Sequence, residues 1–140
     1  MAIRFSQSGN SPLLRDRNRL REFLNSICAG EKRQLKDLSV VFCSDLELLE
    51  LNRIFLGHSY FTDILSFDLG NKAGEVRGEL YISLDRVREN AEKFRESFDN
   101  ELYRVIFHGL LHLCGYQDKT ASQQKTMRGK ENQYLRLYFQ

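Results

Sequence analysis

The sequence predicts one α+β domain over residues 1–140, in which a small mixed sheet of three or four strands packs with about five helices. Three observations support this prediction. Segments with strand and helix periodicity intermix along the chain. Residues 76–84 alternate between apolar and polar types, as in a strand with one buried face. Residues 99–115 are apolar on nearly all sides, which is typical of a buried helix.

The first elements follow from short apolar runs and their flanking residues. Residues 3–5 are expected to form an edge strand. Pro12 precedes a helical pattern of apolar residues, and Gly30 is suited to end that helix. Residues 38–43 are apolar and rich in β-branched types, which favours a buried strand.

The middle of the chain predicts a helix followed by a hairpin. Asp45 is suited to cap the helix, which should end near Gly57. Residues 62–69 are expected to form a strand, and residues 71–74 supply turn-forming types. The alternating strand at 76–84 follows directly, so these two strands are expected to pair.

The last third of the chain predicts three helices. Asp85 is suited to cap the first, and Asp99 is suited to cap a longer one that ends at Gly115. Thr120 or Ser122 is expected to open the C-terminal helix. The middle helix of the three is the buried one, so it should lie at the centre of the fold.

Composition excludes several classes of protein. Apolar residues make up 41% and charged residues 29%, which fits a folded globular chain and not a disordered one. A run of about 18 apolar residues, which a membrane span requires, is missing. The N-terminus has no apolar signal core, so a cytoplasmic protein without a membrane partner is expected.

Cysteines and charge add two weaker indications. Cys28, Cys43 and Cys114 are odd in number and widely spaced, which indicates reduced, partly buried thiols. The net charge of +2 is too small to establish nucleic-acid binding. Basic residues do cluster early, either as a solvated helix face or as a patch for phosphates. They are Arg15, Arg17, Arg19, Arg21, Lys32, Arg33 and Lys36.

Residues 108–118, with the sequence H-G-L-L-H-L-C-G-Y-Q-D, contain the strongest functional pattern. On a helix, the imidazoles of His108 and His112 differ in direction by roughly 40° and point the same way. Gly115 is suited to a left-handed helix terminus, which can turn the chain so that Asp118 reaches the same ion. Two nitrogens, one oxygen and a position open to water are typical of catalytic zinc. The pattern predicts one zinc ion, or another divalent transition metal, at the end of the central helix.

Other interpretations of this segment stay open from the residues alone. A histidine on an apolar helix is commonly a core residue with satisfied hydrogen bonds. Zinc peptidases carry a glutamate base directly after the first histidine. This chain has Gly109 there, so the familiar peptidase mechanism lacks its base. Cys114 lies roughly 200° around the helix from His112 and is not counted as a ligand.

The segment resembles the H-G-x-L-H-L-x-G-Y-D-H pattern of the YbeY family of metal-dependent endoribonucleases, also called ribosomal RNA maturation factors. Upstream, residues 51–52 and 62–67 resemble the family's L-N…T-D-V-L-S-F block. Residues 78–83 resemble its G-D-I-x-I-S strand. The likeness covers roughly residues 38–138, with the three blocks in the same order.

The resemblance implies an α+β fold with one zinc ion at the end of a cleft, held by the three motif positions. It also implies cleavage of single-stranded RNA in ribosomal RNA maturation and small-subunit quality control. The implied partners are ribosomal RNA and the small ribosomal subunit with its proteins. Asp118 departs from the family's third histidine, although a carboxylate is a competent zinc ligand. Leu56 stands where the family usually carries an arginine linked to catalysis, and Arg53 or His58 is considered as its substitute.

The candidate catalytic residues beyond the ligands are His58 and Asp63. His58 is expected in the cleft, and its alternative is a surface loop histidine. Thr62 and Asp63 are expected to line the cleft, and their alternative is capping of the strand start. Ser66 could meet the substrate backbone or simply face solvent. Zinc can activate water or polarise a phosphoryl oxygen, so attack by water and by the ribose 2′-OH both stay open.

Two alternative functions stay open beside the endoribonuclease hypothesis. One is a non-catalytic ribosome-assembly factor with a structural metal, which Leu56 favours because the family arginine is missing there. The other is a metallopeptidase, which the spacing of the ligands allows and Gly109 argues against.

Overall fold

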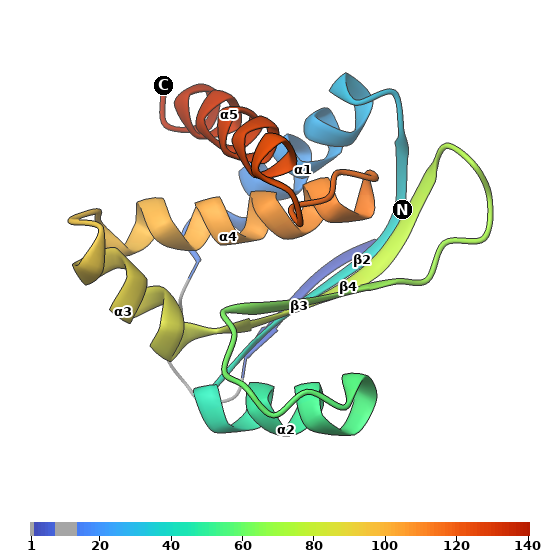
Figure 1. The fold of residues 1–140 in the computed structure, drawn as a ribbon. Helices are drawn as coiled ribbons and strands as arrows, with labels where there is room; N and C mark the ends of the chain where they lie inside the picture. The colour runs from blue at the N-terminus through green and yellow to red at the C-terminus, as the bar shows by residue number, and fades with distance from the viewer. Residues whose placement is uncertain (1, 8–13) are drawn as a thin grey trace.

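The computed structural model describes residues 2–7 and 14–140, so the prediction made for Pro12 lies outside the described residues. Within them, four strands and five helices form a mixed α+β fold, which confirms the predicted fold class (Figure 1). In chain order the elements are β1 (Ala2–Gln7), α1 (Arg17–Gly30), β2 (Gln34–Cys43), α2 (Asp45–Leu56), β3 (Ile64–Asp68), β4 (Glu75–Ser83), α3 (Leu84–Lys93), α4 (Phe98–Leu113) and α5 (Ala121–Tyr138).

The sheet has the strand order β1-β2-β4-β3. β1, β2 and β4 are parallel, whereas β3 runs antiparallel to β4. The expected hairpin is therefore present, and Gly74 at its turn has a φ of 81° that glycine adopts readily. The sheet ends at β1 on one side and at β3 on the other, so β3 has one unpaired edge.

Helix α4 lies on one face of the sheet together with α1, and α5 lies on the far side of α4, while α2 lies on the opposite face of the sheet (Figure 1). Burial of α4 on both sides explains why its residues are apolar in nearly every direction. Ten of its residues are buried, among them Leu102, Ile106 and Leu110, which are fully enclosed. The prediction of a central buried helix is confirmed.

Two glycines set how closely α4 approaches the sheet. A Cβ at Gly109 would lie 2.6 Å from Cδ1 of Ile64 and 2.8 Å from Cδ2 of Leu80. A Cβ at Gly78 would lie 2.7 Å from the carbonyl oxygen of Phe67 and from Cδ1 of Leu113. All four distances are shorter than van der Waals contact, so the helix can lie against β3 and β4 only when these two positions carry no side chain.

The sequence analysis assigned the wrong caps to three helices. Asp45, Asp85 and Asp99 occupy the first turn instead of the cap, where a carboxylate still interacts favourably with the helix dipole. The preceding serines accept the capping bonds, because their extended backbone lets a short hydroxyl reach the first turn. These serines are Ser44, Ser83 and Ser97. Thr120 caps α5 as expected.

Among the described residues, none of the helices combines the length and the hydropathy that a membrane crossing requires. The cysteines also agree with the sequence analysis. All three are free and buried. Cys28 and Cys114 lie with their sulfur atoms 3.8 Å apart, a contact between α1 and the end of α4 that the sequence does not predict.

Candidate metal centre

The last two turns of α4 place His108 and His112 side by side, as their spacing predicts. Their Nε2 atoms are 2.9 Å apart. Oδ2 of Asp118 lies 3.3 Å from Nε2 of His108 and 3.2 Å from Nε2 of His112. The three side chains are only partly buried, so the group that they form is accessible from solvent. The convergence expected from the sequence is therefore present.

A tight turn after α4 brings Asp118 to the histidines. Gly115 has a φ of 107°, and the backbone N–H of Tyr116 donates to the carbonyl of Leu111. This left-handed position reverses the chain direction at the helix end. Further along, the side-chain amide of Gln124 donates to the carbonyl of Asp118. The loop that carries the carboxylate is thus fixed at both ends.

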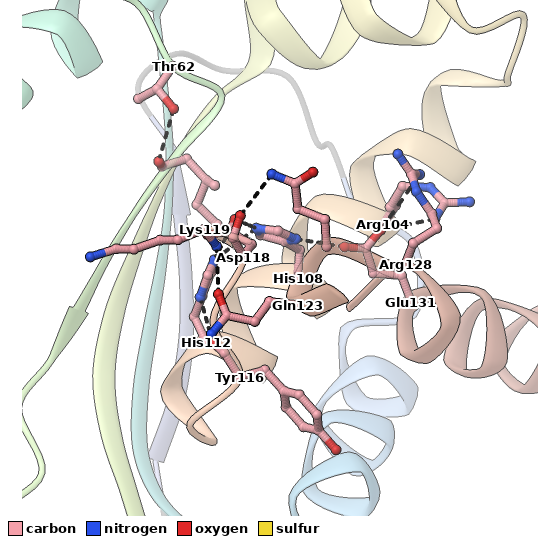
Figure 2. Close-up of polar contacts among 12 residues, drawn as sticks. Thr62, Arg104, His108, His112, Tyr116, Asp118, Lys119, Gln123, Arg128 and Glu131 are labelled. Atoms are coloured by element: carbon pink, nitrogen blue, oxygen red, sulfur yellow. Dashed lines mark hydrogen bonds and ion pairs between the residues drawn. The ribbon is translucent and has the colours of Figure 1, made fainter. Parts of the chain in front are cut away.

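Each imidazole has a second partner that orients it. Nδ1 of His108 lies 2.6 Å from Oε2 of Glu131, and Nδ1 of His112 lies 2.8 Å from the carbonyl oxygen of Tyr116 (Figure 2). A carbonyl oxygen can only accept, so Nδ1 of His112 donates and its Nε2 is free to coordinate when the ring is neutral. Hydrogen bonding of this kind is typical of histidines that bind metals.

The arrangement fits a divalent transition metal. Three atoms that can carry lone pairs converge within 3.3 Å, and their mutual repulsion is relieved when a shared proton or a metal cation lies among them. Two imidazole nitrogens and one carboxylate oxygen are a donor set that zinc accepts. His108, His112 and Asp118 are therefore suited to hold one ion, whose identity the donor set alone does not determine.

The three side chains open onto a cleft of about 360 Å³. Its other walls come from β3 and the residues just before it, which face the end of α4. Those residues are Thr62, Asp63, Ile64, Leu65, Ser66 and Asp68, with Leu113 from α4. The expectation that Thr62, Asp63 and Ser66 lie beside the cleft agrees with this geometry.

The pKa values of Asp63 and His108 in the cleft, and of Glu131 in helix α5 behind it, are shifted by burial and by neighbouring charges. Burial raises the pKa of the Asp63 carboxyl above its ordinary value, although the charge of His108 acts in the opposite direction. Burial also opposes ionisation of Glu131 and His108, but their mutual hydrogen bond and the opposite charges around each of them together outweigh it. The pKa of Glu131 is therefore lowered and that of His108 is raised.

Several predicted residues lie away from this cleft. His58 is exposed and stacks on Tyr60, with 5.0 Å between ring centroids. Arg53 is exposed and pairs with Glu50 at 2.6 Å. Neither lines the cleft, so their predicted catalytic roles gain no support from its geometry.

The early basic cluster also makes structural contacts. Arg19 donates to the carbonyl of Tyr138, and Arg21 donates to the carbonyl of Ile3. Neither guanidinium lines the cleft. These two arginines tie α1 to α5 and to β1, a structural role that differs from both the solvated helix face and the phosphate patch considered from the sequence.

Glu131 is the residue that the sequence analysis missed. It is only 5% exposed and also accepts a hydrogen bond of 3.0 Å from Arg104. The signal was present in α5, where Glu131 lies four residues after Met127 and four before Leu135, on the buried face. A glutamate among buried apolar residues requires a partner, and His108 and Arg104 provide it.

Comparisons with known proteins agree with the geometry. The sequence model of the family described as "Endoribonuclease YbeY" matches residues 5–138. A protein of that name from Cytophaga hutchinsonii is 46% identical over 124 residues, which cover 89% of this chain and 87% of the relative. Another from Parabacteroides distasonis is 48% identical over 117 residues, covering 82% and 80%.

A solved structure shows the same fold. The solution structure of TM1509 from Thermotoga maritima superposes with a TM-score of 0.68 at 32% identity. The match covers 99% of this chain and 89% of the other. The family model spans nearly all of the sequence, and the relatives match most of its length. The chain therefore belongs to the YbeY family.

Proposed function

We propose that this protein is a zinc-dependent endoribonuclease that cleaves single-stranded RNA during ribosomal RNA maturation and small-subunit quality control. The names of its relatives support the class of reaction. The observation that carries the proposal is the convergence of His108, His112 and Asp118 beside an open cleft. We place the protein in the cytoplasm, where its three free cysteines would stay reduced.

The roles of the residues follow from their contacts. A bound zinc ion would supply Lewis acidity, which polarises a phosphoryl oxygen and makes water more acidic. Glu131 and the carbonyl of Tyr116 hold the two imidazoles in the orientation that coordination requires. This fixed geometry lowers the reorganisation needed when a phosphate group enters the cleft.

Asp63 is the candidate general base. It lines the same cleft as the three ligands, and burial raises its pKa toward the range in which a carboxylate accepts protons efficiently. Its proton would come from a water molecule or from the ribose 2′-OH. Asp63→Asn is expected to lower kcat by about 10²–10⁴-fold while zinc binding stays intact. The predicted role of His58 is tested in the same assay with His58→Ala.

Metal analysis and cleavage assays together test the proposal. The purified protein should contain close to one zinc per chain and should cut structured RNA within its unpaired regions. His112→Ala should lose zinc and activity, whereas Asp118→Ala should retain weaker binding. An active His112→Ala variant, or cleavage that a chelator leaves unchanged, would contradict the proposal.

A second candidate is a ribosome-assembly factor in which the metal mainly stabilises the fold. The observation that favours it is Leu56, which stands where the family usually carries an arginine, together with the position of Arg53 outside the set of residues that line the cleft. Slow cleavage that still depends on metal and on Asp118 would reject this candidate. A metallopeptidase gains no support, because the close contacts of Gly109 with Ile64 and Leu80 leave no room for the required glutamate.

A further inference from the structure

The free edge of β3 is a row of backbone groups beside the metal centre. In the strand order β1-β2-β4-β3, no other strand of the described sheet pairs with β3 on its far side. The same strand supplies Ile64, Leu65, Ser66 and Asp68 to the wall of the cleft. Unpaired strand edges are templates for partners that can exchange hydrogen bonds with the backbone.

The register shows which residues face outward. The N–H of Ser83 donates to the carbonyl of Asp63, and the N–H of Leu69 donates to the carbonyl of Arg77. The residues at the β3 end of these two bonds, Asp63 and Leu69, are both odd-numbered. Because antiparallel bonding alternates, the backbone N–H and C=O groups of the even-numbered residues point away from β4. These residues are Ile64, Ser66 and Asp68.

Ser66 is the outward residue at the middle of β3, and its backbone is available. Both backbone groups of Ile64 have partners. Its carbonyl oxygen accepts a weak hydrogen bond of 3.4 Å from the Thr62 hydroxyl, and its N–H donates to the carboxylate of Asp63. At Ser66, by contrast, neither backbone group has a partner among the described residues outside the strand pairing. The backbone N–H and C=O of Ser66 therefore offer a hydrogen-bond donor and an acceptor side by side on the free edge.

The charges around the cleft indicate which part of a nucleotide meets this edge. Asp63 and Asp68 line the cleft at the two ends of β3, so a phosphate held along this strand, away from the proposed metal ligands, would be repelled. A base is neutral, and its Watson–Crick edge carries a donor and an acceptor in neighbouring positions. The edge of β3 is therefore complementary to a base and not to the backbone of RNA.

We infer that an unpaired base of the substrate forms hydrogen bonds through its Watson–Crick edge to the backbone N–H and C=O of Ser66. This inference rests on the proposed function and adds a physical basis for single-strand specificity. A base that is paired in a duplex has its Watson–Crick edge occupied, so it cannot bind the strand. The contact uses main-chain atoms, which explains why no side-chain pattern in the sequence indicates it.

The test removes one backbone donor without breaking the sheet. Ser66→Pro deletes the outward N–H, and proline is tolerated at such edge positions. Ser66→Ala is the reference, because it removes the hydroxyl and keeps the N–H. Binding of a fluorescent oligouridylate to the zinc-loaded protein would be measured by stopped-flow anisotropy, before cleavage shortens the RNA. Ser66→Pro should bind about 3- to 10-fold more weakly than Ser66→Ala, as expected for one hydrogen bond.

A modified RNA gives an independent measurement. Uridine methylated at ring nitrogen N3 loses the donor that would meet the carbonyl of Ser66. The wild-type protein should bind this RNA several-fold more weakly, whereas Ser66→Pro should discriminate less between the two RNAs. If Ser66→Pro does not fold, as judged by its thermal transition, the comparison of the two RNAs on the wild-type protein decides the question.

The outcomes separate this inference from the proposed function. Equal binding of both RNAs, or of single-stranded and duplex RNA, overturns the base contact even if zinc-dependent cleavage is observed. Cleavage that fails with every RNA, although base-edge binding is present, overturns the endoribonuclease proposal and leaves the contact standing. Failure of the protein to bind RNA at all overturns both.

Discussion

Replacing Glu131 by glutamine tests whether this buried carboxylate supports the metal centre. Its Oε2 lies 2.6 Å from Nδ1 of His108, and its Oε1 accepts from Arg104 at 3.0 Å. Glutamine keeps the shape and one acceptor oxygen, but it removes the negative charge. The amide can still accept one hydrogen bond, so either His108 or Arg104 loses its charge-assisted partner.

The expected loss follows from the role of such partners. Removing the hydrogen-bond partner of a metal-binding histidine typically weakens metal affinity by about 10- to 100-fold, or roughly 1.4–2.7 kcal/mol. Glu131→Gln should fall near the lower end, because the amide oxygen can still orient His108. Glu131→Ala should fall near the upper end, because it leaves both His108 and Arg104 without this acceptor.

The assay is competition for zinc between the protein and a chromophoric chelator, with thermal unfolding recorded in parallel. Glu101→Gln is the matched control, since Glu101 is also 5% exposed and pairs with Arg104 at 3.9 Å. It makes no contact with either histidine among the interactions of the described residues. The reasoning is refuted if Glu131→Gln binds zinc as tightly as the wild type. It is equally refuted if Glu101→Gln weakens binding to the same degree.

Four further predictions concern stability, pH and the response to zinc. Gly78→Ala should destabilise the protein by about 1–3 kcal/mol in denaturant unfolding, since its Cβ would meet the Phe67 carbonyl at 2.7 Å. Gly129 lies in helix α5, and a Cβ added there would meet nothing within 4 Å. Gly129→Ala should therefore stabilise the protein by up to roughly 1 kcal/mol, and a destabilised variant would contradict the open space found around this position. In the metal-free protein, the raised pKa of His108 stabilises the fold at pH values below its ordinary 6.5. This stability should disappear as pH rises through the folded-state pKa, and Glu131→Gln should flatten that part of the unfolding profile. Zinc at 100 times its Kd should raise the free energy of unfolding by about 2.7 kcal/mol, and a Tm that does not respond to zinc would argue against a bound ion.

Local patterns in the sequence predicted much of the metal centre. Two histidines four residues apart must share a helix face, and a glycine after the helix must allow a reversal. These rules involve only residues 108–118, so they hold regardless of how the rest of the chain folds. The same locality made the alternating strand and the buried helix predictable, because periodicity reports which faces are covered.

The helix caps show where local inference was insufficient. Aspartate and serine are both good capping residues, and the sequence offers both at three helix starts. The choice depends on the backbone conformation of the residue just before the helix. At α2, Asp45 instead contacts Arg86 at 3.1 Å and accepts from Ser83, two residues far away in the sequence.

The sequence alone indicated the set of candidate metal ligands and the types of the elements that carry them, since both depend on short-range spacing. Only the tertiary structure decided that Glu131 stands behind His108, that His58 lies outside the cleft and that the edge of β3 forms its wall. These features join segments separated by tens of residues. Their positions depend on how closely α4 packs against the sheet and α5, and the spacing of residues along one element carries no information about that distance.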